Sequence, residues 1–168
     1  MIKEAKDLLE GIIKNLIPGV TVVKSTAEES RQIMVRNFPL VSLITNPGNF
    51  DDSEARTIRY HDEQDGGYKQ RYVRGNRVLP VLVRCWAAGE DEADAVFSRI
   101  IPAVPSRWEC GDFTGSVEIG AEEHSDHTGN VAKLYLSVAE VRFSAAAAMD
   151  AELVPVFETV EQEGGEFA

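Results

Sequence analysis

Apolar residues recur every three or four positions in two stretches of the chain, and this spacing predicts two main amphipathic helices. The first covers residues 2–17 and ends at Pro18-Gly19, and the second covers about residues 89–101 and ends at Pro102. A shorter helix is predicted across residues 27–35, because Ser25 and Glu28 have capping-box spacing. Residues 33–35 are also compatible with an extended chain.

Short β-branched or apolar runs, bounded by turn residues, predict the strands. Residues 74–77 should break or bend the chain, and Pro80 is expected at a sheet edge or a bulge, because proline lacks a backbone N–H. Near Ala139 the apolar positions change parity, which predicts a bulge or a change of partner face. Residues 104–113 are expected to be irregular and residues 122–130 to form a polar turn. The predicted strands are 20–23, 40–45, 56–60, 68–73, 78–86, 115–119 and 133–144.

The order of these elements predicts an α+β fold. Helix, strands, helix and strands follow one another with hairpin-like connections, which favours a mostly antiparallel sheet flanked by two main helices on one face. A chain of 168 residues fits one such domain. We assign residues 1–150 to this single α+β domain and residues 151–168 to an acidic C-terminal arm.

Composition excludes several classes of protein. The net charge of −11 argues against non-specific binding to nucleic acid, which needs a basic surface. No apolar run is long enough to predict a membrane span, and the N-terminus lacks the pattern of a secretory signal. Two separated cysteines, Cys85 and Cys110, are expected to be reduced and partly buried. These features predict a protein that stays in the cytoplasm where it is made.

Charge is unevenly distributed along the chain. Between Arg56 and Arg84 there are seven basic and three acidic residues, whereas from Glu109 onward there are thirteen acidic and two basic residues. Opposite patches favour head-to-tail contact between identical subunits, and the alternative is that the two regions neutralise each other inside one monomer. The apolar segment 153–157 can add a strand to an adjacent subunit. The candidate subunit-interface residues are Arg56, Arg59, Arg71, Arg74, Arg77, Leu153, Val156 and Phe157.

Signatures of catalysis are missing. The chain has no phosphate-binding glycine loop, no nucleophile elbow and no His-Glu-x-x-His motif. His124 and His127 lie three residues apart beside carboxylates, a set that can ligate zinc or manganese, but an exposed polar turn is the alternative. We therefore predict no catalytic, cofactor or metal site and no enzymatic activity, with a small metal-dependent hydrolase as the alternative.

The layout from Tyr68 to Phe143 resembles the tail terminator (tail completion) proteins of long-tailed bacteriophages and prophages. The matching parts are the strands of residues 68–86, the helix 90–101 and the strands 115–120 and 131–144. The resemblance implies a structural virion protein that forms a hexameric ring, caps the tail tube and joins it to the head or connector. Its implied partners are further copies of itself, the tail tube protein and the neck connector. Its implied location is the virion tail, assembled in the host bacterial cytoplasm.

Two other binding roles remain open at this level. A neck or head–tail joining protein has the same size and ring geometry as a tail terminator. A monomeric ligand-binding domain also fits the composition, and mass in solution distinguishes it from a ring.

Overall fold

The computed structural model is built around one large sheet, and it describes residues 1–52, 56–61, 68–110, 113–128 and 133–152. Strands run in the order β1-β2-β5-β8-β7-β6, with β3 and β4 also paired to β5. Only β1 and β2 are parallel within this described sheet, which confirms the predicted mostly antiparallel α+β fold. The strands are β1 (Thr21–Val23), β2 (Leu40–Thr45), β3 (Asn49–Asp51), β4 (Arg56–His61), β5 (Tyr68–Ala87), β6 (Arg107–Cys110), β7 (Phe113–Thr128) and β8 (Lys133–Glu152).

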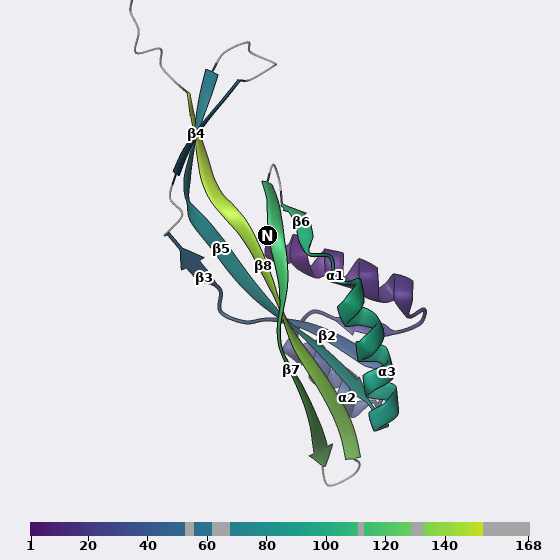
Figure 1. Ribbon diagram of the computed structural model, residues 1–168. Helices are drawn as coiled ribbons and strands as arrows, with labels where there is room; N and C mark the ends of the chain where they lie inside the picture. Colours follow the sequence, from purple (N-terminus) through teal and green to yellow (C-terminus); the bar gives the residue numbers. More distant parts are fainter. Residues whose placement is uncertain (53–55, 62–67, 111–112, 129–132, 153–168) are drawn as a thin grey trace, which may run out of the picture.

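Two helices cover one face of the sheet, as predicted (Figure 1). Helix α1 (Ile2–Leu16) buries Ala5, Leu9 and Ile13, which are four residues apart and so share one stripe. Helix α3 (Glu90–Ile100) continues into a 3₁₀ turn, η1 (Ile101–Ala103), where Pro102 is tolerated because the first N–H groups of a helix need no partner. Alternate residues of the central strands complete the core beneath these helices: Leu79, Val81, Val83 and Cys85 of β5, and Ala139, Val141 and Phe143 of β8.

Helix α2 (Thr26–Met34) contacts β2 on the opposite face of the sheet. Ser25 caps it by accepting the Glu28 N–H, which confirms the capping prediction. Its one buried residue is Glu29, whose carboxylate accepts hydrogen bonds from Ser42 Oγ at 2.5 Å and Trp86 Nε1 at 2.7 Å, and pairs with Arg84 at 3.2 Å. Each of these donors compensates part of the cost of burying a carboxylate. None of the described helices is long and apolar enough to cross a membrane.

The predicted break at residues 74–77 is wrong, because β5 runs for 20 residues without interruption. The chain bends there through a register shift between Val73 and Gly75, which leaves Arg74 as the extra residue. Pro80 is not on an edge strand, since β5 is central. On one side of β5, β2 pairs only as far as Val81 and β3 begins at Val78, so the missing N–H of Pro80 falls in the gap between them.

Two further predictions in the C-terminal half are corrected. Within residues 104–113 a short strand, β6, pairs with β7, and residues 122–128 continue β7 instead of turning. The bulge expected near Ala139 lies in the partner strand: the register of β7 shifts by one residue between Ile119 and Glu122, while β8 keeps an unbroken register with β5 from Ala87 to Gly75. Polar residues form strand here because β8 supplies the hydrogen-bonding partner, which local sequence cannot show.

Strand length explains the shape of the molecule. Strands of 20 residues such as β5 and β8 span roughly 65 Å at about 3.3 Å per residue. Helices of 15 and 11 residues, α1 and α3, span roughly 22 and 16 Å. The sheet therefore extends beyond its helices (Figure 1). We call the uncovered part the extension: β3, β4, residues 68–78 of β5 and residues 145–152 of β8.

Candidate functional site

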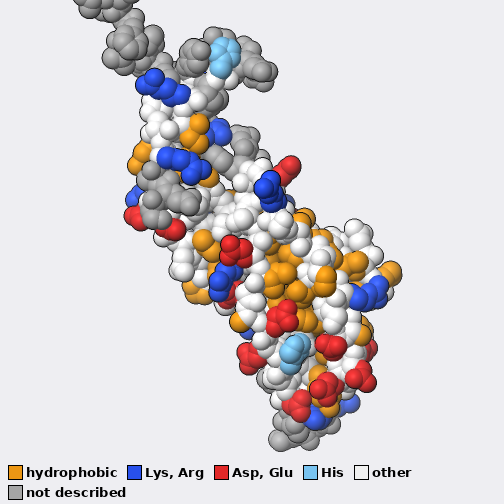
Figure 2. Space-filling view, viewed as in Figure 1, with side chains coloured by type: hydrophobic (Ala, Val, Ile, Leu, Met, Phe, Trp, Pro, Cys, Tyr) orange, Lys and Arg blue, Asp and Glu red, His pale blue; other side chains and the backbone are white. Residues whose placement is uncertain are grey.

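Basic and acidic side chains gather at opposite ends of the molecule. Figure 2 shows Lys and Arg mainly over the extension, and Asp and Glu mainly over the end where α3 begins and the β7–β8 hairpin lies. The carboxylates of this acidic end are all exposed, and they are Glu90, Asp91, Glu92, Asp94, Glu122, Glu123 and Asp126. Separation of this kind makes the protein electrostatically complementary to a second copy of itself.

The extension brings together all five arginines predicted for a subunit interface. Arg56 and Arg59 lie on β4, and Arg71, Arg74 and Arg77 on β5. Since β4 pairs antiparallel with β5, residues directly opposite each other share a face. The face that continues the helix-covered side of the sheet carries Arg59, Tyr72, Arg77 and Phe50, and the other carries Arg56, Ile58, Arg71 and Val73.

Not all of these arginines are equally available. The backbone register places position 150 opposite Arg71 and position 152 opposite Lys69. Arg59 and Arg77 are exposed and form no ion pair within the described part of the chain. Arg74 is also exposed, and its guanidinium lies 5.8 Å from the centre of the Phe50 ring.

Apolar side chains are exposed on both faces of the extension. Ile58 is 38% exposed on one face, while Tyr72 on the other is 46% exposed. Phe50, at the base, is 47% exposed. The predicted interface residues Leu153, Val156 and Phe157 lie outside the described residues.

A hollow of about 310 Å³ lies at the base of the extension. Arg56, Ile58 and Val73 line it from the extension, and Thr114 and Ser116 line it from β7. Close packing of backbones holds this junction in place. A Cβ on Gly75 would lie 2.1 Å from the Asp51 carbonyl oxygen, so only glycine lets β3 pass so near the bulge of β5.

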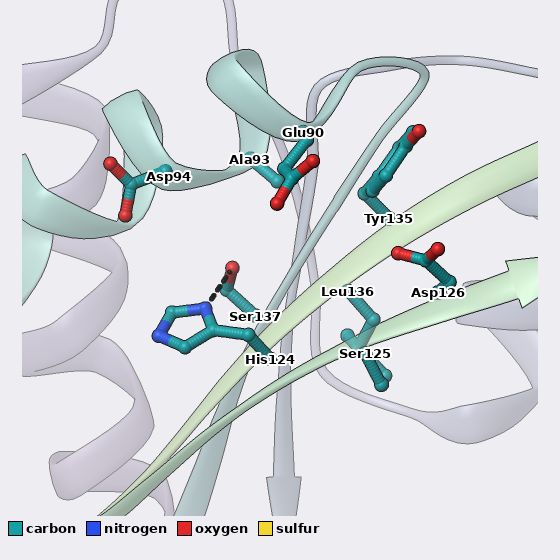
Figure 3. Close-up of a pocket in the computed structure, with 9 residues that line it drawn as sticks. All are labelled: Glu90, Ala93, Asp94, His124, Ser125, Asp126, Tyr135, Leu136 and Ser137. Atoms are coloured by element: carbon teal, nitrogen blue, oxygen red, sulfur yellow. Dashed lines mark hydrogen bonds between the residues drawn. The ribbon is translucent and has the colours of Figure 1, made fainter.

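A larger hollow, about 540 Å³, lies at the acidic end between α3 and the strands β7 and β8. Figure 3 shows Glu90 and Asp94 on α3 facing His124, Asp126 and Tyr135 across it. The β7 bulge decides which residues reach it: before the bulge Val117 points under the helices, and after it the even-numbered positions His124 and Asp126 do. Three carboxylates on one rim make the hollow suited to a cationic group.

Two basic or titratable groups already lie close to the rim. His124 Nδ1 is 2.9 Å from Ser137 Oγ, and its ring meets Phe97 edge-to-face at 5.5 Å. Lys133 pairs with Asp126 at 2.8 Å, and hydrogen bonds to Asp126 and then to Tyr135 raise the pKa of this lysine above its ordinary value. Lys133 therefore stays charged and offsets only Asp126.

The structure does not support joint metal ligation by His124 and His127. The two positions are three apart on a continuous strand, so they belong to opposite faces of the sheet. Within the described ranges, no group of three or more His, Cys, Asp or Glu side chains is arranged to hold a metal ion. Cys85 is a free, buried thiol, and burial raises its pKa to about 12, which leaves it unreactive.

Sequence reasoning identified the basic surface but missed the acidic hollow. Residues 122–130 were expected to form a polar turn, so no strand was predicted to face the acidic first turn of α3. The sequence signal for this hollow was the alternation of His124 and Asp126, which places both residues on one face of a strand.

Compared with known proteins, the chain matches no protein-family model, and no curated protein matches it closely enough to count as a relative.

Proposed function

We propose that this chain is a structural virion protein of the tail-terminator type, which forms a homo-oligomeric ring that ends a phage tail tube and joins it to the head or connector. The observation that carries this proposal is the extension. It projects beyond the helices as a thin sheet with exposed apolar side chains on both faces. The function needs contact surfaces and no catalytic group.

A sheet of this kind is poorly supported within a single subunit. Strands need a covered apolar face to be independently stable, and an edge strand such as β4, which pairs with β5 among the described strands, invites further pairing. A neighbouring subunit in a ring supplies the missing layer. Charges on the extension then restrict which partner can bind, since like charges across an interface are costly.

The order of elements also supports the tail-terminator type. Long strand β5 leads directly into α3, and strands β7 and β8 follow it, in the order that the resemblance implies. Virion assembly in the bacterial cytoplasm and a final place in the virion tail follow from this proposal, as do the tail tube protein and the connector as partners.

The first experiment is the mass in solution, measured by light scattering after size exclusion at low and high salt. A ring is expected at about six times the 18.5 kDa chain mass, with weaker association at high salt because salt screens exposed charges. A chain that remains monomeric under all conditions contradicts the proposal.

A second measurement distinguishes a terminator from a neck protein. Added to polymerising tail tube protein, a terminator caps the tubes and shortens them, which negative-stain electron microscopy measures. Tubes of unchanged length, together with binding to the connector alone, would identify the neck alternative.

A further inference from the structure

The two ends of this molecule have the composition of two halves of one interface. At the extension, Arg59 and Arg77 are exposed on the face that also carries Tyr72. At the acidic end, Glu90, Asp94 and Asp126 surround a hollow of about 540 Å³, and Glu122 lies on the same side of the sheet. Neither set of charges is compensated by the other within the monomer, because they lie at opposite ends (Figure 2).

We infer that the extension of one subunit docks, through Arg59, Arg77 and the neighbouring aromatic surface, against the acidic end of a second copy of the chain. This inference rests on the proposed ring function and names the contact that would build it. Different surfaces meet in such a contact, so it is heterologous, and repeated heterologous contacts close into rings when the rotation permits.

Several observations favour a second copy over a small cation as the occupant of the hollow. The hollow measures about 540 Å³, and the described residues there form no metal-binding group. Guanidinium groups bind carboxylates in a bidentate manner, and Glu90 and Asp94 offer exposed carboxylates at the rim. The extension supplies arginines from the same chain, together with the apolar area that an interface core needs.

Within the monomer, the carboxylates of the acidic end outnumber the basic side chains that lie near them. Among the described residues of α3 before Arg99 and of the β7–β8 hairpin end, Lys133 is the basic residue, and it is held by Asp126. Glu90 and Glu122 are exposed and form no ion pair within the described part of the chain. Their repulsion is relieved when a basic surface binds.

Charge reversal tests the contact. One variant carries Arg59→Glu with Arg77→Glu, and the other carries Glu90→Arg with Glu122→Arg. Each places like charges against each other in a homotypic ring, so each alone should associate roughly a hundredfold more weakly than the wild type. Mixed in equal amounts, the two variants should regain the wild-type mass, because in an alternating ring every contact again joins opposite charges.

The control for the arginine variant is Lys3→Glu with Arg31→Glu, which lowers the net charge by the same amount at exposed positions on α1 and α2. It should assemble as the wild type does. Thermal unfolding of each variant, followed by circular dichroism, checks that the monomers remain folded.

The outcomes separate the contact from the ring itself. If the wild type forms rings and both charge-reversed variants still assemble, this contact is wrong, but the proposed function is unaffected. Loss of assembly in each variant without recovery in the mixture also overturns the pairing of these two surfaces. A wild-type chain that is monomeric at all concentrations and salts overturns the contact and the ring together.

Discussion

The two halves of β5 belong to one continuous strand but have opposite surroundings. From Leu79 to Ala87, alternate side chains are buried beneath α1 and α3, and none of these five is more than 2% exposed. From residues 68 to 77 the strand carries four of the chain's basic residues, and Tyr72 is 46% exposed. Backbone pairing with β8 continues through both halves, with one register shift between Val73 and Gly75. Hydrogen bonding therefore sets the length of the strand, whereas side-chain burial decides which half stabilises the monomer.

This comparison divides the molecule by role. The body, which we define as the chain outside the extension, holds a core of apolar side chains from α1, α3 and alternating strand positions. The extension offers surface, charge and open edges instead. Substitutions in the body should change the free energy of unfolding, and those in the extension should change association.

The largest effect on stability is expected for Phe143→Ala. Phe143 is fully buried and meets Trp108 edge-to-face at 5.0 Å. Its truncation should lower the free energy of unfolding by about 3–5 kcal/mol, through lost burial and the cavity left behind. Urea denaturation measures the loss, with Tyr72→Ala in the extension as the matched aromatic control, expected to cost less than about 1 kcal/mol. Equal losses in both variants would erase the distinction between body and extension.

A somewhat smaller loss, about 2–3 kcal/mol, is expected for Glu29→Ala. The substitution leaves Ser42 and Trp86 without their acceptor and removes the partner of Arg84. Glu29→Gln keeps an acceptor oxygen and the side-chain volume, so it should lose less. Thermal and urea unfolding compare the two variants, and an unchanged Glu29→Ala protein would show that the network contributes nothing to holding α2.

Gly75→Ala should act locally at the base of the extension. The added Cβ would collide with the backbone of Asp51 and Asp52, which should destabilise the packing of β3 against β5 by on the order of 1–3 kcal/mol. Amide hydrogen exchange should then speed up in β3 and β4, while the body keeps its protection. Gly11→Ala, where an added Cβ meets no atom within 4 Å, should instead stabilise α1 by about 0.5–1 kcal/mol. Unchanged exchange in β3 would mean that this close approach is not required.

The smallest effect on stability is expected for Ile58→Ser. This side chain is 38% exposed on the extension, so unfolding of the dilute monomer should change by no more than about 0.5 kcal/mol. Association measured by light scattering should nevertheless weaken. A loss above about 1 kcal/mol in the monomer would indicate that the extension is already covered within one subunit.

The sequence by itself determined the local elements and the fold class. Periodicity predicted α1 and α3, the Ser25 cap predicted α2, and apolar runs predicted β1, β2 and β4, because these signals depend on residues a few positions apart. It also identified the five arginines now found on one extension, since their clustering in the sequence survives in a hairpin. The acidic residues of α3 and β7 were visible too, but not their meeting across a hollow.

Only the tertiary structure decided how far the strands run and what covers them. Residues 74–77 and 122–128 lack strand-like patterns, yet β8 pairs with both and so extends β5 and β7 through them. The position of Pro80 in a central strand was likewise settled by where β2 ends and β3 begins. In each case the deciding hydrogen-bond partner is a different strand, and the energy of pairing with it outweighs the local preference of the residues. That is also why a single strand forms both a buried core and an exposed, charged extension.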